Sequence, residues 1–174
     1  MKISVKLTGA LYTEILNDLS QKHPFAAERV GFVAGRIGAA TDGGRLVFLT
    51  CYYPIADAEY LDDRLIGARI GSEAITKAMQ TVYHGRANSE GVFHIHLHGH
   101  RGETSMSHVD SHEIPPLIPG FQSVGSDAPH GIIILSLDHG SAWVWLPGND
   151  EPIQAASLSI IGAPIRVFRH TRNV

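Results

Sequence analysis

The chain has 174 residues, of which 44% are hydrophobic and 18% charged, and this balance is typical of a folded globular protein. The formal net charge is −3 and no basic patch stands out, which argues against a dedicated nucleic-acid binder. The lone Cys51 excludes an intrachain disulfide framework and a cysteine-rich zinc site. No apolar run approaches the roughly 20 residues that span a bilayer, and charged residues interrupt the first segment too often for a secretory signal. We therefore expect a single cytoplasmic domain over residues 1–174, with neither nucleic acid nor membrane as a partner.

The first half of the chain predicts a strand, a helix, a hairpin and a second helix. Residues 3–7 alternate apolar and polar like a half-buried strand, and Thr8 can cap a helix that runs to about Lys22 with Leu11, Ile15 and Leu19 on one face. Two β-prone runs, 29–37 and 45–53, flank "GAATDGG" and predict a hairpin. Residues 55–71 carry mixed signals and are expected to be irregular. The second helix should run from Ser72 to about His84, with Ile75, Met79 and Val82 forming its apolar stripe.

The second half predicts mostly strands. A strand is expected over 91–98, and a short helix should begin at Ser107 and stop at the "PP" of 115–116. The runs 131–137 and 141–146 flank "DHG" and predict a hairpin, and residues 155–170 supply one or two final strands. The expected fold is α/β (α+β), with a mixed, largely antiparallel sheet and two main helices.

A row of four histidines marks the strand at 91–98. In "FHIHLHGH" a histidine occupies every second position, namely His94, His96, His98 and His100. The period of two places all four on one face if the strand extends that far. Histidine is the commonest metal ligand near neutral pH, and two imidazoles in an H-x-H pattern lie close enough to share one cation. The row therefore predicts metal binding by some of its members.

A second motif follows the histidine row. "SHVD" at 107–110 brings Ser107 and Asp110 together at S-x-x-D spacing, which is also the spacing of a helix capping box. A helix that begins at Ser107 would point both side chains back toward the end of the histidine strand. The motif can therefore cap the helix and complete a metal site.

H-x-H followed by S-x-x-D resembles the signature of the JAB/MPN (JAMM) metalloproteases, in which two histidines and the aspartate bind zinc. That family also has an upstream glutamate on the segment leading into an apolar, glycine-containing strand. "AAERVGFVAGR" (26–36) is similar to this segment and puts Glu28 at the glutamate's position. "PHGIIILSLDHGSAWVW" (129–145) is similar to the hairpin that follows the site in bacterial members. The resemblance spans about residues 3–146 and implies a JAB/MPN-like fold.

The spacing after the histidine row departs from the family's pattern. The family usually has proline after the second histidine and seven residues between that histidine and the serine, whereas eight residues separate His98 from Ser107. His96 and His98 are the favoured pair, because the discrepancy is one loop residue and Gly99 can supply the bend. The pairs His98–His100 and His94–His96 remain open as alternatives.

The resemblance implies a zinc-dependent peptidase or isopeptidase. Zn²⁺ would be bound by His96, His98 and Asp110, Glu28 would be the general base, and the Ser107 hydroxyl would help to hold the oxyanion. The implied substrate is an amide or isopeptide bond at the C-terminus of a ubiquitin-like protein or its conjugates. A looser similarity to JAB proteins encoded beside ubiquitin-activating and ubiquitin-conjugating homologues in bacteria adds E1- and E2-like proteins as expected partners.

Two other hypotheses compete with the peptidase. The first is a catalytically silent MPN-type module that acts through protein–protein interaction. The second is a related JAB fold in DNA repair, which the acidic balance disfavours. Retention of the glutamate, the histidines, the serine and the aspartate favours the peptidase, because a scaffold needs none of them.

Overall fold

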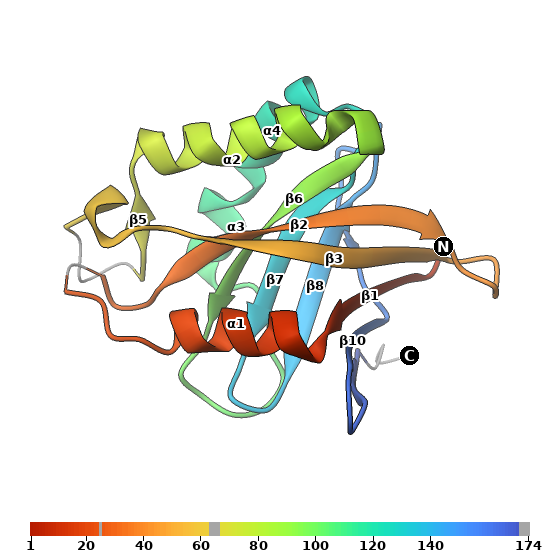
Figure 1. Ribbon diagram of the computed structural model, residues 1–174, viewed down its shortest axis with the longest axis horizontal. Coiled ribbons are helices and arrows are strands. Elements are labelled where there is room, and N and C mark those ends of the chain that lie inside the picture. Colours follow the sequence, from red (N-terminus) through yellow and green to blue (C-terminus); the bar gives the residue numbers. More distant parts are fainter. Residues whose placement is uncertain (25, 63–66, 171–174) are drawn as a thin grey trace.

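One long, strongly twisted sheet runs through the protein (Figure 1). The computed structural model describes residues 1–24, 26–62 and 67–170. The nine strands of this sheet follow the order β11-β10-β1-β3-β2-β6-β7-β8-β9. Their bounds are β1 (Ile3–Thr8), β2 (Val30–Ala39), β3 (Arg45–Pro54), β6 (Glu90–Leu97), β7 (His130–Leu135), β8 (Gly140–Trp145), β9 (Ile153–Gln154), β10 (Ser157–Ile161) and β11 (Arg166–Arg169). A small separate sheet pairs β4 (Tyr60–Leu61) with β5 (Arg69–Ile70).

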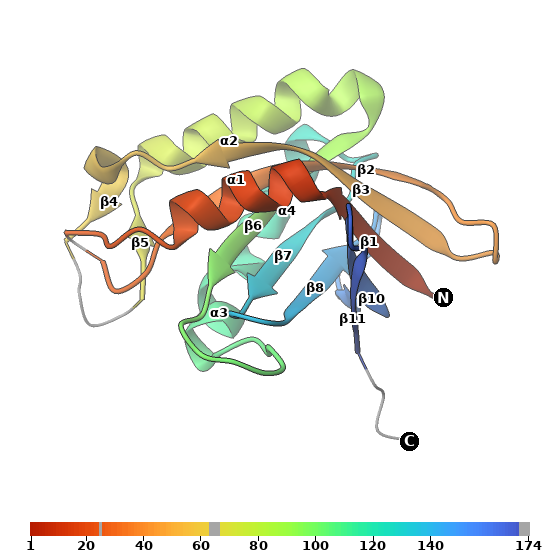
Figure 2. The same ribbon diagram turned by 60° about the horizontal axis from the view of Figure 1, so that its bottom comes forward.

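The sheet is mixed and largely antiparallel, as the sequence predicts. β2 pairs with β3, and β7 with β8, as the two expected hairpins. Parallel pairing joins β1 to both β3 and β10, and β6 to β7. Figure 2 shows β1, β10 and β11 at the end of the sheet that carries the C-terminus. The α+β class is thus confirmed, while the arrangement specific to the JAB/MPN family stays a prediction.

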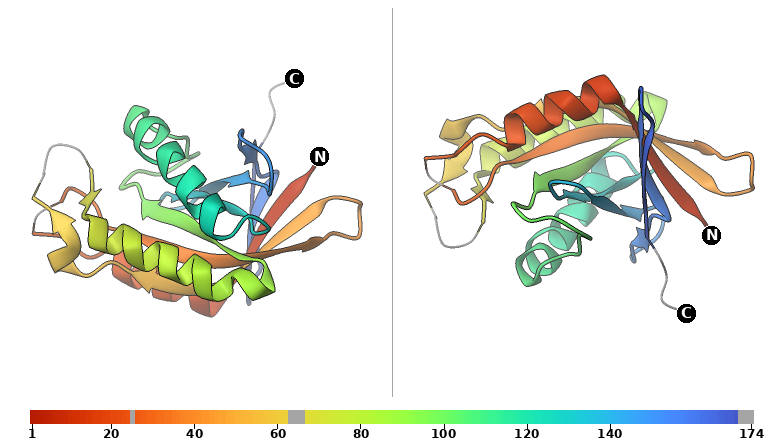
Figure 3. Two further views of the ribbon diagram at one scale, coloured as in Figure 1. Left: turned by 90° about the horizontal axis from the view of Figure 1, so that it is seen from above. Right: turned by 90° about the horizontal axis from the view of Figure 1, so that it is seen from below.

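The helices lie on both faces of the sheet. α1 (Gly9–Leu19) covers one face, and α2 (Ser72–Gly85), α3 (His108–Glu113) and α4 (Ile118–Val124) cover the other (Figure 3). Short 3-10 turns occupy Asp57–Glu59, Arg86–Asn88 and Pro115–Leu117. Among the described residues, no helix has both the length and the apolar character needed to cross a membrane.

Three details of the helices correct the sequence predictions. α1 is capped by Thr8 as expected, but it ends at Leu19 rather than near Lys22. In α2 the expected Val82 is buried, but Ile75 and Met79 lie at the margin of the buried face, where Ala74 and Ala78 take their place, since small side chains let the helix approach the sheet. α3 stops before the "PP" at 115–116 as expected, but these prolines open a 3-10 turn that leads into a helix the sequence did not predict, α4, because proline is tolerated in the first turn of a helix.

Two further regions differ from expectation. The segment 55–71 is not wholly irregular, because it holds a 3-10 turn and the β4–β5 pair; residues 63–66 of it lie outside the described residues. Cys51 is exposed, although it lies in an apolar run along β3.

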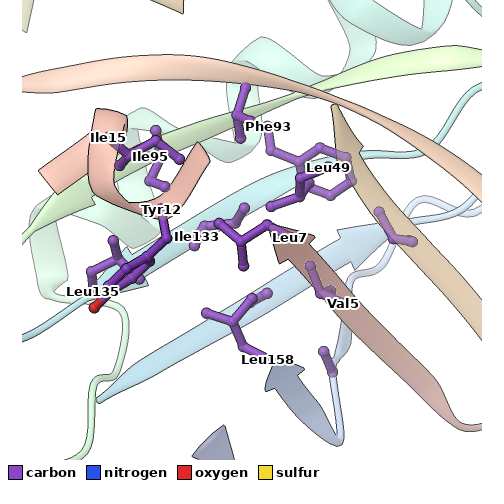
Figure 4. Close-up of a cluster of buried hydrophobic side chains, with 14 of the residues drawn as sticks. Val5, Leu7, Tyr12, Ile15, Leu49, Phe93, Ile95, Ile133, Leu135 and Leu158 are labelled. Atoms are coloured by element: carbon purple, nitrogen blue, oxygen red, sulfur yellow. The ribbon is translucent and has the colours of Figure 1, made fainter. Parts of the chain in front are cut away.

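The alternation along β6 divides the protein into two cores. Phe93 and Ile95 point toward α1 and pack with Leu7, Leu49 and Ile133 (Figure 4). Val92 points to the opposite face and packs with residues of α2 and α4. Because side chains alternate along a strand, His94 and His96 share this second face with Val92. His94 and His96 therefore lie on the face of the sheet that α2, α3 and α4 cover.

His130 anchors β7 to its surroundings from a fully buried position. The Val92 N–H donates to its Nδ1 at 3.3 Å, and its Nε2 donates to the Gly125 carbonyl oxygen at 3.2 Å. Burial lowers the pKa of His130 below its usual 6.5. The folded protein therefore keeps this imidazole neutral at pH values where the unfolded chain binds a proton.

This difference predicts acid sensitivity. Below about pH 6.5 the unfolded state binds more protons, so the free energy of unfolding should fall by up to about 1.4 kcal/mol per pH unit for this residue. In His130→Gln, which does not titrate, the decrease in urea midpoint between pH 7.5 and pH 5.5 should be smaller than in the wild type. The exposed His84→Gln serves as control and should keep the wild-type decrease. Equal acid sensitivity in all three proteins would contradict this role of His130.

Candidate metal centre

Two histidines at the end of β6 reach the same point as Asp110 of α3. The Nε2 atoms of His96 and His98 lie 3.0 Å apart. His96 Nε2 lies 3.4 Å from Asp110 Oδ1, and His98 Nε2 lies 3.9 Å from Asp110 Oδ2. Each of the three residues offers one possible metal-ligand atom, and these atoms lie within 4.8 Å of one another. The three side chains thus form a cluster, His96–His98–Asp110, that is compatible with a bound metal ion.

The separations fit a small tetrahedral cation. Ligand atoms about 2.0–2.1 Å from a tetrahedral zinc ion are separated from one another by about 3.3–3.4 Å. The His96–His98 separation of 3.0 Å and the 3.4 Å from His96 Nε2 to Asp110 Oδ1 lie near that value, and the 3.9 Å from His98 Nε2 reaches the other carboxylate oxygen, Oδ2. Burial lowers the pKa of both imidazoles, although the carboxylate of Asp110 opposes this shift. Neutral imidazoles keep the lone pairs that a metal ion requires.

Asp110 is held in place by the start of α3. The Ser107 N–H donates to Asp110 Oδ2 at 2.7 Å, and the Asp110 N–H donates to Ser107 Oγ at 3.1 Å. This is the capping box expected from the sequence, and its Asp110 carboxylate also faces the two imidazoles. Ser107 is exposed, and no described residue accepts a hydrogen bond from its hydroxyl. The S-x-x-D motif therefore caps the helix and completes the cluster.

The loop between β6 and α3 is anchored to the β7–β8 hairpin. The His98 N–H donates to the Leu135 carbonyl and extends the β6–β7 pairing past the last residue of β6. Farther along, Thr104 Oγ1 donates to the Ile134 carbonyl, and Ser141 Oγ donates to the Thr104 carbonyl. Figure 2 shows α3 beside the ends of β6 and β7. These bonds direct the loop back to the strand end, so that Asp110 reaches His96 and His98 although eight residues separate His98 from Ser107.

The other two histidines of the row lie outside the cluster. His94 is buried, its ring centroid lies 5.5 Å from that of His96, and its buried Nδ1 has no hydrogen-bond partner among the described residues. His100 is exposed, and its Nδ1 lies 3.0 Å from the Arg101 carbonyl oxygen. Among the described residues, His96 and His98 are thus the pair that meets Asp110, and this is the pair that the sequence favours.

Glu28 lies next to this cluster. Val30 of β2 pairs with His96 of β6 in antiparallel register, so continuing that register by two residues puts Glu28 opposite His98. Burial, and secondarily the charge of Asp110, raise the pKa of Glu28 to about 7. Gly67 packs directly against the carboxylate, because a Cβ there would lie 2.8 Å from Glu28 Oε1, and its φ of +63° also favours glycine. A partly enclosed carboxyl group that titrates near neutrality is suited to proton transfer.

Buried polar contacts fix the backbone on which Glu28 sits. Arg29 is buried, and its Nη2 donates to Asp57 Oδ1 at 2.6 Å. The Tyr60 hydroxyl accepts from the Val30 N–H and donates to the Val30 carbonyl, both at 2.9 Å. Sequence reasoning missed Asp57 and Tyr60, because both lie in the segment expected to be irregular and no local pattern links them to residues 29 and 30.

Comparison with known proteins does not assign the chain to a family. Neither a scan against protein-family models nor a search of curated proteins gives a match. The functional argument therefore depends on the residues and their geometry.

Proposed function

We propose that the protein is a zinc-dependent peptidase or isopeptidase of the JAB/MPN type. The observation that carries this proposal is the convergence of His96, His98 and Asp110 at one point, with the carboxyl group of Glu28 beside them. Three protein ligands with a free fourth position are the usual protein contribution to a catalytic zinc site. A pure interaction module would gain nothing from burying two imidazoles against a carboxylate, since such burial carries a desolvation penalty.

The chain's own residues account for the proton transfers of amide hydrolysis. When bound, zinc would lower the pKa of a water molecule and polarise the scissile carbonyl. Glu28 accepts the proton of the attacking water as the new carbon–oxygen bond forms. It then delivers this proton to the departing nitrogen as the carbon–nitrogen bond breaks. The Ser107 hydroxyl donates to the carbonyl oxygen as negative charge develops there.

For the substrate we propose the C-terminal tail of a ubiquitin-like protein, either in a precursor or in a conjugate. The support is the resemblance to the JAB/MPN motif, and E1- and E2-like proteins are the partners that would accompany such a substrate. An extended tail would be recognised through main-chain hydrogen bonds and a few side-chain pockets.

Cleavage of model fusions tests the proposal. Ubiquitin-like proteins fused through their C-termini to green fluorescent protein should be cut at the junction by the zinc-loaded protein, and a chelator should stop the reaction until zinc is restored. Stoichiometric zinc without cleavage of any fusion would contradict the proposed substrate. Absence of zinc together with capture of an intact fusion would instead support the silent interaction module.

A further inference from the structure

A pocket opens beside the metal-compatible cluster, on the same face of the sheet. It measures about 440 Å³, within the range of roughly 300–1,000 Å³ typical of ligand pockets. Most of its described lining is apolar and comes from β2, β4, β5, α2 and the turn after α3: Val30, Leu61, Ile70, Ile75, Ile114 and Leu117. Arg69 and Glu113 bring one positive and one negative charge to it.

One polar side chain in the wall lacks a partner. His94 lines the pocket and is only 5% exposed, and its buried Nδ1 has no hydrogen-bond partner among the described residues. Buried polar groups in native structures are nearly always hydrogen-bonded, because an unmade bond costs on the order of 1–3 kcal/mol. Apart from Arg69 and Glu113 the other residues that line the pocket are apolar, so a bound ligand is the natural source of the missing bond.

The pocket lies close to the His96–His98–Asp110 cluster, because His94 and His96 belong to the same strand. His94 and His96 are two residues apart on one strand, and their rings lie 5.5 Å apart. An extended peptide rises about 3.3 Å per residue, so the separation of the rings corresponds to between one and two residues of substrate. A peptide whose scissile amide lies at His96–His98–Asp110 can therefore place a side chain from within two residues of that amide against His94.

We propose that this pocket binds a tyrosine side chain of the substrate within two residues of the scissile amide, and that His94 selects for its hydroxyl. The aromatic ring matches the apolar walls. A hydroxyl both donates and accepts, so it can satisfy an imidazole nitrogen in either tautomer. The inference deepens the proposed peptidase function and assigns a specificity-determining role to His94.

Binding of small amides tests the pocket without any need for cleavage. N-acetyl-tyrosinamide, N-acetyl-phenylalaninamide and N-acetyl-glycinamide would be titrated into the protein while NMR follows the His94 ring and the β6 amides. The tyrosine amide should shift the His94 signals and bind about threefold to tenfold more tightly than the phenylalanine amide, as one hydrogen bond implies. The glycine amide should not bind.

Three variants sharpen the test. His94→Phe keeps a ring but removes the nitrogens, so it should bind the tyrosine and phenylalanine amides equally. Ile75→Trp narrows the pocket from α2 and should abolish binding of both. The matched control Thr81→Trp lies on the same helix but lines a separate hollow of about 160 Å³, and it should bind as the wild type does.

The outcomes separate this inference from the proposed function. Binding at His94 by a protein that cleaves no fusion would sustain the pocket and contradict the peptidase. Cleavage without any shift at His94, up to the solubility limit of the tyrosine amide, would sustain the peptidase and overturn the pocket. An unchanged tyrosine preference in His94→Phe would overturn the role of His94.

Discussion

Purified protein is expected to contain about one zinc ion per chain, and His98→Ala is expected to lose most of it while His100→Ala keeps it. His98 Nε2 lies 3.0 Å from His96 Nε2 and faces Asp110, whereas His100 is exposed and bonds to the next residue's carbonyl. Removal of a ligand should weaken zinc affinity by more than the roughly 10- to 100-fold typical of an outer-shell partner. Elemental analysis and competition with a chromogenic chelator give the stoichiometry and the affinity.

Asp110→Asn tests whether the carboxylate of Asp110 contributes to zinc binding. Its amide oxygen can still accept from the Ser107 N–H, so the cap of α3 should persist while the negative charge at the cluster is lost. We expect weaker zinc binding with an unchanged far-ultraviolet circular dichroism spectrum. If His100→Ala lost the metal and His98→Ala retained it, the ligand pair assigned here would be wrong.

Glu28→Gln is expected to retain zinc and to lose hydrolysis by about 100- to 10,000-fold, the usual contribution of a general base. Glutamine keeps the size of the side chain against Gly67 but cannot take up the proton of the attacking water. The measurement is single-turnover cleavage of whichever fusion the wild type cuts, with zinc content determined on the same samples.

An exposed acid in the loop after β6 provides the control for this variant. Glu103→Gln removes the same charge from an exposed position outside the cluster, and it should retain wild-type cleavage. Full activity of Glu28→Gln would show that Glu28 is not the base. Loss of zinc together with activity would assign Glu28 to the integrity of the site instead of to proton transfer.

The parts of the fold that follow from local chemistry were predictable from the sequence. Thr8 caps α1, both β-hairpins form where turn residues separate apolar runs, and Ser107 with Asp110 builds the capping box. Helix α4 was missed, because the pair of prolines before it reads as a stop although proline is acceptable at the start of a helix. Of the stripe predicted for α2, Val82 is buried, but Ala74 and Ala78 take the buried places expected for Ile75 and Met79, because alanines contribute little to a hydrophobic stripe yet allow the closest packing.

The candidate site was predictable only in its residue types. The motif favours His96, His98 and Asp110, and their convergence depends on the parallel pairing of β6 with β7 and on the anchored loop, which connect residues far apart in the chain. The same holds for Glu28, whose position opposite His98 follows from the β2–β6 register. The support of Glu28 by Tyr60 and Asp57, and the pocket at His94, involve no local pattern that a sequence displays.

The anchored loop between β6 and α3 also has a thermodynamic consequence. In many small zinc proteins the ligands are scattered in the metal-free chain, so metal binding and folding are one event. Here strand pairing, the Thr104 and Ser141 hydroxyls and the capping box already hold the ligand side chains together. The conformational entropy of these side chains is lost when the domain folds, so binding of a metal ion would cost little further entropy. A metal ion that binds to this cluster would then exchange on a scaffold that is already folded.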